Sequence, residues 1–197
     1  MDADHKIIET APITIQETWQ ALEEVVDLGI AKSIGISNAQ AQTLYDIQRY
    51  ARHPISSLQI EHHPYLVQAE LVELAQEEKI VVTAYSSFGP QSFLELPPAF
   101  HARAKDVSLL FDVDAVKKVA TRLGKTPAQV LLRWATQRNI AVIPKSNNVT
   151  RLQQNLEVGS GSFELTKQEI DSISALDKGL RFNDPGFYLE KPLRIFA

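Results

Sequence analysis

The loop Lys145-Ser146-Asn147, with Arg151 a few residues later, has the side chains that commonly bind phosphate. It follows an apolar run at 140–143, and Thr150 is placed to cap the helix that comes next. Free amides at a helix amino terminus, beside a lysine and an arginine, suit a phosphate dianion. A solvated loop with two surface cations would have the same composition. The cluster therefore predicts a phosphate site and leaves the plainer role open.

Three more polar positions follow short apolar runs. Asn38 and Gln59 have amide side chains, which can both donate to and accept from a carboxamide, although strand-end hydrogen bonding is the simpler role. Tyr85-Ser86 follows an apolar run that is typical of a buried strand. The tyrosine ring there could face a planar ligand or simply pack at the edge of the core. Ser86 could donate to a pyrophosphate. Because ligands gather at the carboxyl ends of parallel strands, these positions are expected to meet at one rim.

The adjacent residues His62 and His63 are weak candidates for a metal site. Neighbours on an extended chain point to opposite faces, and no further ligand lies at a suitable spacing. The chain has no cysteine, which excludes disulfides and thiolate metal sites. We predict no metal. Glu61 and Glu95 could form an acid/base pair, but nothing in the sequence fixes their separation.

The elements that would position these groups alternate between helix and strand. Strands begin about 22–24 residues apart in the first part of the chain, which is typical of repeated strand–helix units. We expect strands at 33–36, 57–60, 80–84 and 140–143. We expect helices at 39–51, 70–78, 114–123 and 127–138, and capping boxes at Thr14/Glu17, Thr150/Gln153 and Thr166/Glu169. Residues 88–111 and 179–197 are expected to form loops.

This alternation predicts one α/β domain over residues 1–197, built on a parallel sheet. A doubly wound sheet and half of an eight-stranded barrel both fit the pattern. No G-x-G-x-x-G opens a helix, which disfavours a Rossmann fold. The net charge of -4 gives no indication of nucleic-acid binding. No apolar stretch reaches the roughly 20 residues that span a bilayer, so we expect a cytoplasmic protein without a membrane partner.

Several segments resemble motifs of the aldo-keto reductase family and follow one another in family order: 34–38, 59–65, 83–91, 131–134 and 143–147. Segments 88–93 and 179–185 resemble its fungal xylose (aldose) reductase branch. The resemblance implies the carboxy-terminal half of a (β/α)8 TIM-type barrel, with about four parallel strands and an incomplete barrel. It also implies hydride transfer from NADPH, or alternatively NADH, to a small aldehyde or an aldose, of the xylose-to-xylitol type.

The resemblance assigns the nicotinamide end of the cofactor to strand ends. Ser37, Asn38 and Gln59 match the residues that hold the carboxamide, and Tyr85 matches the ring stacked on the nicotinamide. The pyrophosphate clamp would lie after the third strand and consist of Ser86, Phe88 and Gln91.

The adenosine end would be held by the loop after the fourth strand. The residues that match contacts to the 2′-phosphate are Lys145, Ser146, Asn147 and Arg151. Gln154 and Asn155 match adenine contacts. Glu95 matches a carboxylate that accepts hydrogen bonds from the ribose hydroxyls, which would also allow NADH to be used as the cofactor. Asn183 matches a residue on the substrate side.

The family's proton donor is a tyrosine whose pKa is lowered by a lysine and an aspartate, while a histidine orients the carbonyl. By resemblance these four residues belong upstream of Met1, and none of the tyrosines here lies in a matching motif. We therefore expect a chain truncated at its amino terminus, without catalytic residues and inactive alone. Open sheet edges would favour self-association. The alternatives are a non-catalytic nucleotide-binding or interaction module, and another phosphate-binding barrel enzyme.

Overall fold

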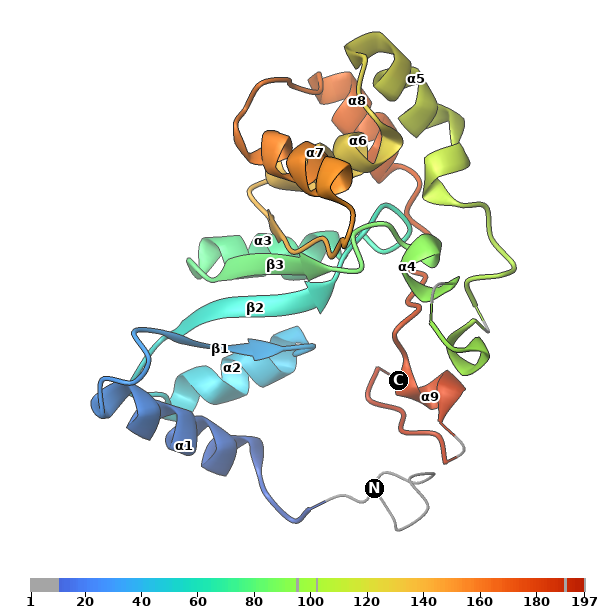
Figure 1. Ribbon diagram of the computed structural model, residues 1–197. Coiled ribbons are helices and arrows are strands. Elements are labelled where there is room, and N and C mark those ends of the chain that lie inside the picture. The colour runs from blue at the N-terminus through green and yellow to red at the C-terminus, as the bar shows by residue number, and fades with distance from the viewer. Residues whose placement is uncertain (1–10, 95, 102, 190, 197) are drawn as a thin grey trace. The chain divides into compact units, whose positions relative to one another are not determined.

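The structure is a computed structural model that describes residues 11–94, 96–101, 103–189 and 191–196 (Figure 1). The chain divides into two units. The first unit contains the residues up to Ile60 and Ala69–Thr83, and the second contains Glu61–Gln68, Ala84–Tyr188 and the residues from Pro192 onward. Two strands begin in the first unit and end in the second.

Four strands form a sheet in sequence order: β1 (Ile34–Ser37), β2 (Ile55–Glu61), β3 (Val81–Tyr85) and β4 (Ala141–Val142). β1 and β2 run parallel, with Ser37 opposite Gln59. The order and the intervening helices confirm the expected α/β fold. Among the described residues the sheet does not close into a barrel, which agrees with the expected partial barrel. β2 begins two residues earlier than expected, and β4 is only two residues long.

Gly35 makes the pairing of β1 with β2 possible. A Cβ atom at this position would lie 2.1 Å from Ser57 Oγ and 2.4 Å from the Ser57 carbonyl oxygen. Real Cβ atoms do not approach a backbone oxygen so closely, so any larger residue would push the strands apart. The register also shifts between Ile34 and Gly35.

The helices of the first unit are α1 (Ile15–Asp27), α2 (Ala41–Tyr50) and α3 (Ala69–Glu77). α1 packs against α2 and β1 (Figure 1). The expected capping box is confirmed, because Thr14 Oγ1 accepts from the Glu17 amide and the Glu17 side chain accepts from the Thr14 amide. The core of this unit is aliphatic apart from Trp19, and its most deeply buried hydrophobic residues are Trp19, Leu44, Ile47, Leu58, Ile60, Ala75 and Val82.

The longer helices of the second unit are α5 (Asp114–Leu123), α6 (Pro127–Thr136), α7 (Val149–Gly159) and α8 (Lys167–Ser174). α6 packs against α5, α7 and β4, and α5 also packs against α8 (Figure 1). The Thr166/Glu169 capping box is confirmed. Thr126 caps α6 and Pro127 occupies its first turn. In the described ranges, no helix combines the length and apolar character needed to cross a membrane.

Three local expectations are wrong. The cap of α7 is Asn148, whose side chain accepts from the Arg151 amide, so Thr150 lies inside the first turn instead of preceding it. Residues 88–111 are not a plain loop, because they contain α4 (Pro90–Leu94) and two short 3-10 turns, Pro98–Phe100 and Leu110–Asp112. The segment after 179 contains α9 (Pro185–Tyr188). Helices this short are too brief to show a periodic pattern in the sequence.

Candidate functional site

The first unit brings together the three residues expected to hold a carboxamide. Ser37 lies opposite Gln59 in the parallel register, and the amide of Asn38 donates to the Gln59 carbonyl at 2.8 Å. Asn38 has a φ of 57°, in the left-handed region that asparagine tolerates better than most residues. The chain therefore turns sharply at the end of β1. The geometry places the three side chains at one strand end, and their role in binding remains a prediction.

In the second unit, β3 delivers Tyr85 and Ser86 to its carboxyl end. Burial raises the pKa of Tyr85 to about 12, even though Asn183 Nδ2 donates to its hydroxyl at 2.9 Å. Ser86 has a φ of 53°, which is uncommon for a serine. Such backbone strain tends to collect at binding sites. The turn is fixed by the Gly89 amide, which donates to the Ser86 carbonyl at 2.8 Å.

The loop expected to clamp a pyrophosphate is tightly packed. The Phe88 ring lies 5.5 Å from the Phe111 ring, and Gly89 has a φ of 60°. A Cβ atom on Gly89 would come within 2.7 Å of Leu110 Cδ1. Gln91 is half-buried in α4. Glu95, the remaining residue expected near this loop, lies outside the described residues.

The residues expected to bind an adenosine phosphate all lie between β4 and the second turn of α7. Lys145, Asn147 and Arg151 are exposed, whereas Ser146 is half-buried. The Asn148 amide donates to Ser146 Oγ at 3.1 Å, so the serine helps to order the loop. Gln154 and Asn155 follow on α7 and are half-buried. A cation pair thus flanks a capped helix terminus, but the cap is provided by Asn148.

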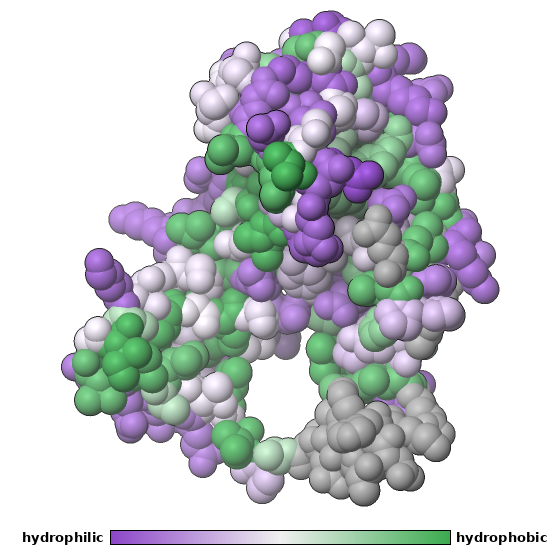
Figure 2. Space-filling model, viewed as in Figure 1, coloured by the Kyte–Doolittle hydropathy of each residue, from purple (hydrophilic) through white to green (hydrophobic). Residues whose placement is uncertain are grey.

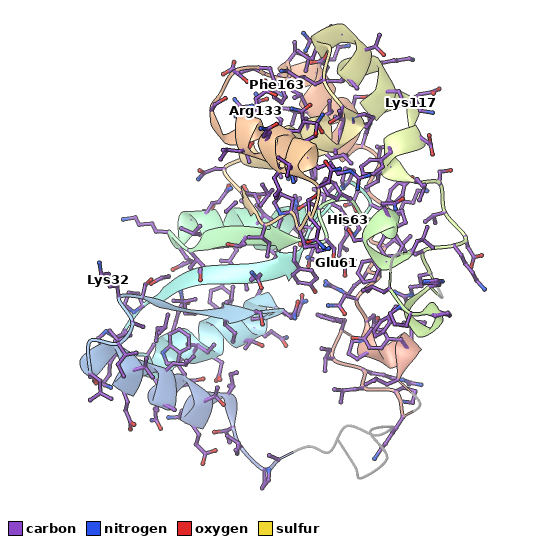
Figure 3. The ribbon with its side chains drawn as sticks, viewed as in Figure 1. Lys32, Glu61, His63, Lys117, Arg133 and Phe163 are labelled. Carbon is purple, nitrogen blue, oxygen red and sulfur yellow. The ribbon has the colours of Figure 1, made fainter. Side chains whose placement is uncertain are left out.

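Glu61 has a role that the sequence did not reveal. Its side chain is fully buried, and Oε1 lies 2.9 Å from His63 Nε2 (Figure 3). It also accepts from two consecutive backbone amides, Phe182 at 2.8 Å and Asn183 at 2.9 Å. A glutamate that ends a buried strand was a usable signal, because a buried charge needs partners. The two amide partners, however, lie more than a hundred residues later.

His62 and His63 do point to different surroundings, as their adjacency on an extended chain predicted. The His62 ring stacks on Trp134 with 4.9 Å between centroids, and Arg138 Nη1 lies 3.1 Å from its Nε2. Burial, with smaller contributions from Arg138 and His63, lowers the pKa of His62 to about 3. The His63 ring instead packs on Phe182. The described residues contain no group of three side chains that could hold a metal ion.

Asn183, the expected substrate-side residue, lies between two tyrosines. Its Nδ2 donates to the Tyr85 hydroxyl at 2.9 Å, and its Oδ1 accepts from the Tyr188 hydroxyl at 3.0 Å. The residue expected beside the substrate therefore contacts the ring expected beside the nicotinamide. Because an amide can donate two hydrogen bonds and accept two, each end of Asn183 retains capacity for one more partner.

Comparison with known proteins places these groups in context. The pattern of the Aldo/keto reductase family matches residues 2–178. A protein of Aspergillus flavus and one of Aspergillus terreus, both described as probable NAD(P)H-dependent D-xylose reductases, are 60% and 61% identical to the chain over 187 residues. A protein of Aspergillus niger, named NAD(P)H-dependent D-xylose reductase, is 58% identical over 187 residues.

Each of these alignments covers 94% of the chain and 57% of the relative. The chain therefore spans little more than half the length of the curated relatives that it matches.

Proposed function

Because the chain belongs to the aldo/keto reductase family, we propose that it carries the cofactor-binding side of an NAD(P)H-dependent reductase of aldehydes or aldoses. The names of the Aspergillus relatives support D-xylose or a similar aldose as the substrate and NADPH as the cofactor, with NADH as an alternative. When bound, the reduced nicotinamide would supply a hydride to the carbonyl carbon.

The described side chains suit such a cofactor chemically. In the first unit, the amides of Asn38 and Gln59 can donate to and accept from a carboxamide. In the second unit, Tyr85 offers a ring and Ser86 a hydroxyl at the end of β3, and Asn183 would contact the substrate. Lys145 and Arg151 would pair with a phosphate on the adenosine, because both are exposed beside the amino terminus of α7. This exposed cation pair is the observation that carries the proposal.

The test is a double variant, Lys145→Ala/Arg151→Ala, titrated with NADPH and with NADH by fluorescence. Loss of two charge-assisted hydrogen bonds, at about 1.5–3 kcal/mol each when fully formed, should weaken NADPH binding by at least about tenfold. NADH, which has no 2′-phosphate, should be affected much less. The matched control is Lys117→Ala/Lys118→Ala, which removes two positive charges from α5.

Equal losses for the two cofactors would contradict the assignment of the cation pair to the 2′-phosphate. An equal loss of NADPH affinity in the control variant would mean that the effect comes from the change in net charge and not from these two side chains. If the unsubstituted chain binds neither cofactor, the proposed function itself fails.

We further propose that the 197-residue chain does not reduce aldoses by itself. A tyrosine needs a lowered pKa to donate a proton near neutral pH. Burial instead raises the pKa of four of the tyrosines, Tyr50, Tyr65, Tyr85 and Tyr188. The fifth, Tyr45, lies half-exposed on α2. Oxidation of NADPH in the presence of D-xylose, followed by absorbance, would contradict this expectation, whereas cofactor binding without turnover would favour a nucleotide-binding module.

Self-association is part of the same proposal. Val149, Leu152 and Leu156 recur along α7 and are exposed by 46–80%, and Figure 2 shows hydrophobic residues in this region of the surface. Exposed apolar surface and uncovered strand edges favour association between copies of a chain. We expect species larger than a monomer in sedimentation velocity. A monodisperse monomer over a wide concentration range would contradict the expectation.

A further inference from the structure

The buried carboxylate of Glu61 has no part in the cofactor chemistry proposed above. It accepts from three donors within the second unit: His63 Nε2 and the backbone amides of Phe182 and Asn183. Both carboxylate oxygens are used, because the Phe182 amide bonds to Oε1 and the Asn183 amide to Oε2. A carboxylate only accepts, so three converging donors match its chemistry.

The segment held by Glu61 has no regular structure to satisfy its amides. Residues 177–184 lie between α8 and α9, and a buried amide must find a partner outside a helix or sheet. The Phe182 side chain is only 4% exposed and Asn183 is half-buried, so water is a poor substitute. Glu61 is therefore the acceptor for the Phe182 and Asn183 amides, while the Tyr65 carbonyl accepts from the amides of Lys178 and Leu180 earlier in the segment.

Ring packing holds the same point of the segment. The Phe182 ring lies 5.2 Å from the His63 ring and 5.5 Å from the Phe93 ring. His63 thus contributes twice, since it donates to Glu61 and packs on the residue whose amide Glu61 accepts. Arg181, the preceding residue, donates to the Gln68 side chain, whose own amide donates to the Glu61 carbonyl. The chain is thus held at Arg181, Phe182 and Asn183.

We propose that Glu61 is a positioning residue: by holding the Phe182 and Asn183 amides, it sets the Asn183 side chain against the Tyr85 hydroxyl. The remaining donor and acceptor of the Asn183 amide are then directed at a fixed place, which suits a hydroxyl-rich substrate. This last step rests on the proposed function. The positioning itself does not, because it concerns contacts of the protein with itself.

The test compares Glu61→Gln with Glu23→Gln by hydrogen exchange and by NMR, without any cofactor. Glu23 is a matched control, since it is also buried and also accepts from two consecutive amides, those of Arg52 and His53. Glutamine is similar in size. In Glu61→Gln it presents an amino group to one of the two amides, because these bond to different oxygens. In Glu23→Gln the carbonyl oxygen can keep both amides, which bond to Oε1, and the amino group then faces the Arg52 side chain. We expect exchange at 180–186 to accelerate at least about tenfold in Glu61→Gln, with no change at 51–54. Glu23→Gln should leave exchange at 180–186 unchanged.

The second readout separates positioning from general stability. The side-chain amide resonances of Asn183, assigned through Asn183→Asp, should shift in Tyr85→Phe because the acceptor is lost. They should shift in Glu61→Gln as well, and stay in place in Glu23→Gln. Unchanged Asn183 side-chain signals in Glu61→Gln would overturn the proposal.

A measurement on the unsubstituted chain covers the case in which Glu61→Gln does not fold. The Phe182 and Asn183 amides should exchange as slowly as the amides of β2, because both are held by a buried acceptor. Rapid exchange at these two amides would overturn the proposal. A failure here is distinct from a failure of the cofactor titrations, which use different variants and a different ligand.

Discussion

Two buried glutamates, one in each unit, each accept hydrogen bonds from two consecutive backbone amides, but they hold different parts of the fold. Glu23 on α1 accepts from the amides of Arg52 and His53, at the junction between α2 and β2. Glu61 at the end of β2 accepts from the amides of Phe182 and Asn183. Both side chains are at most 1% exposed. Each carboxylate replaces the regular backbone partners that a turn or irregular segment lacks.

The two glutamates differ in what completes their surroundings. Glu23 is 3.3 Å from Arg52 Nε, and the Arg52 side chain is 58% exposed. Glu61 is 2.9 Å from a histidine with no exposure at all. Water can therefore replace part of the Glu23 arrangement but little of the Glu61 arrangement. The same hydrogen-bond pattern therefore stabilises a fold junction in one unit and a candidate-site segment in the other.

The largest expected effect comes from truncating the two glutamates. Glu61→Ala should lower the free energy of unfolding by about 3–5 kcal/mol, because it leaves three buried donors without an acceptor. Glu23→Ala should cost about 1–3 kcal/mol, since solvent can reach the amides of Arg52 and His53. Urea unfolding followed by circular dichroism gives both values.

Equal losses in the two alanine variants would remove the distinction between the sites. A larger loss in Glu23→Ala would reverse it, and would place the main stabilising carboxylate at the α2–β2 junction.

A second effect separates the two units by pH. The pKa of His62 is about 3 in the folded chain and 6.5 when unperturbed, so the unfolded chain binds the extra proton between these values. Stability should then fall as pH drops from about 6.5 to about 3, by roughly 1 kcal/mol per pH unit.

Burial raises the pKa of Glu23, but hydrogen bonds from the His53 and Arg52 amides outweigh it, and the net pKa is below 4.5. Its contribution is present above pH 4.5 and is lost on further acidification.

The chain's two tryptophans allow the pH dependence of stability to be measured separately for each unit. Trp19 lies in the first unit, whereas Trp134 lies in the second and stacks on His62. In Trp19→Phe, the remaining Trp134 fluorescence should report destabilisation that begins near pH 6.5. His62→Gln should remove that early loss, and the control His101→Gln should retain it. Destabilisation of the second unit that starts only below pH 4.5 would contradict the His62 assignment.

The sequence predicted those features whose partners are close along the chain. Capping boxes join residues three apart, so Thr14/Glu17 and Thr166/Glu169 were accessible to pattern analysis. The ends of β1 and β3 were also accessible, since polar residues follow apolar runs there. The cap of α7 was mispredicted because Asn148 and Thr150 are both good caps and local pattern does not choose between them.

The contacts of Glu61 could not be predicted from one sequence. Its amide partners lie 121 and 122 residues later, and backbone amides leave no trace in residue type. The resemblance predicted Asn183 on the substrate side, which stays a prediction, and did not predict its bonds to Tyr85 and Tyr188. Long-range hydrogen bonds to the backbone depend on the tertiary path of the chain, which no local pattern specifies.

The smallest effect concerns the capping boxes of α1 and α8, again one in each unit. Thr14→Ala and Thr166→Ala should each cost about 1 kcal/mol, because each removes the acceptor for one amide of the first turn.

The glutamates of the two boxes should differ. Glu17→Gln should leave the urea midpoint unchanged, because Gln129 already fills the same position in the box of α6. Glu169→Gln should lower it, because Glu169 also accepts from Arg122 Nε at 2.5 Å and Nη2 at 2.6 Å. Added salt should shrink the Glu169→Gln loss, since exposed ion pairs are screened, while the threonine losses should persist. Equal glutamine effects in the two boxes would mean that the Arg122 pair adds nothing to its cap.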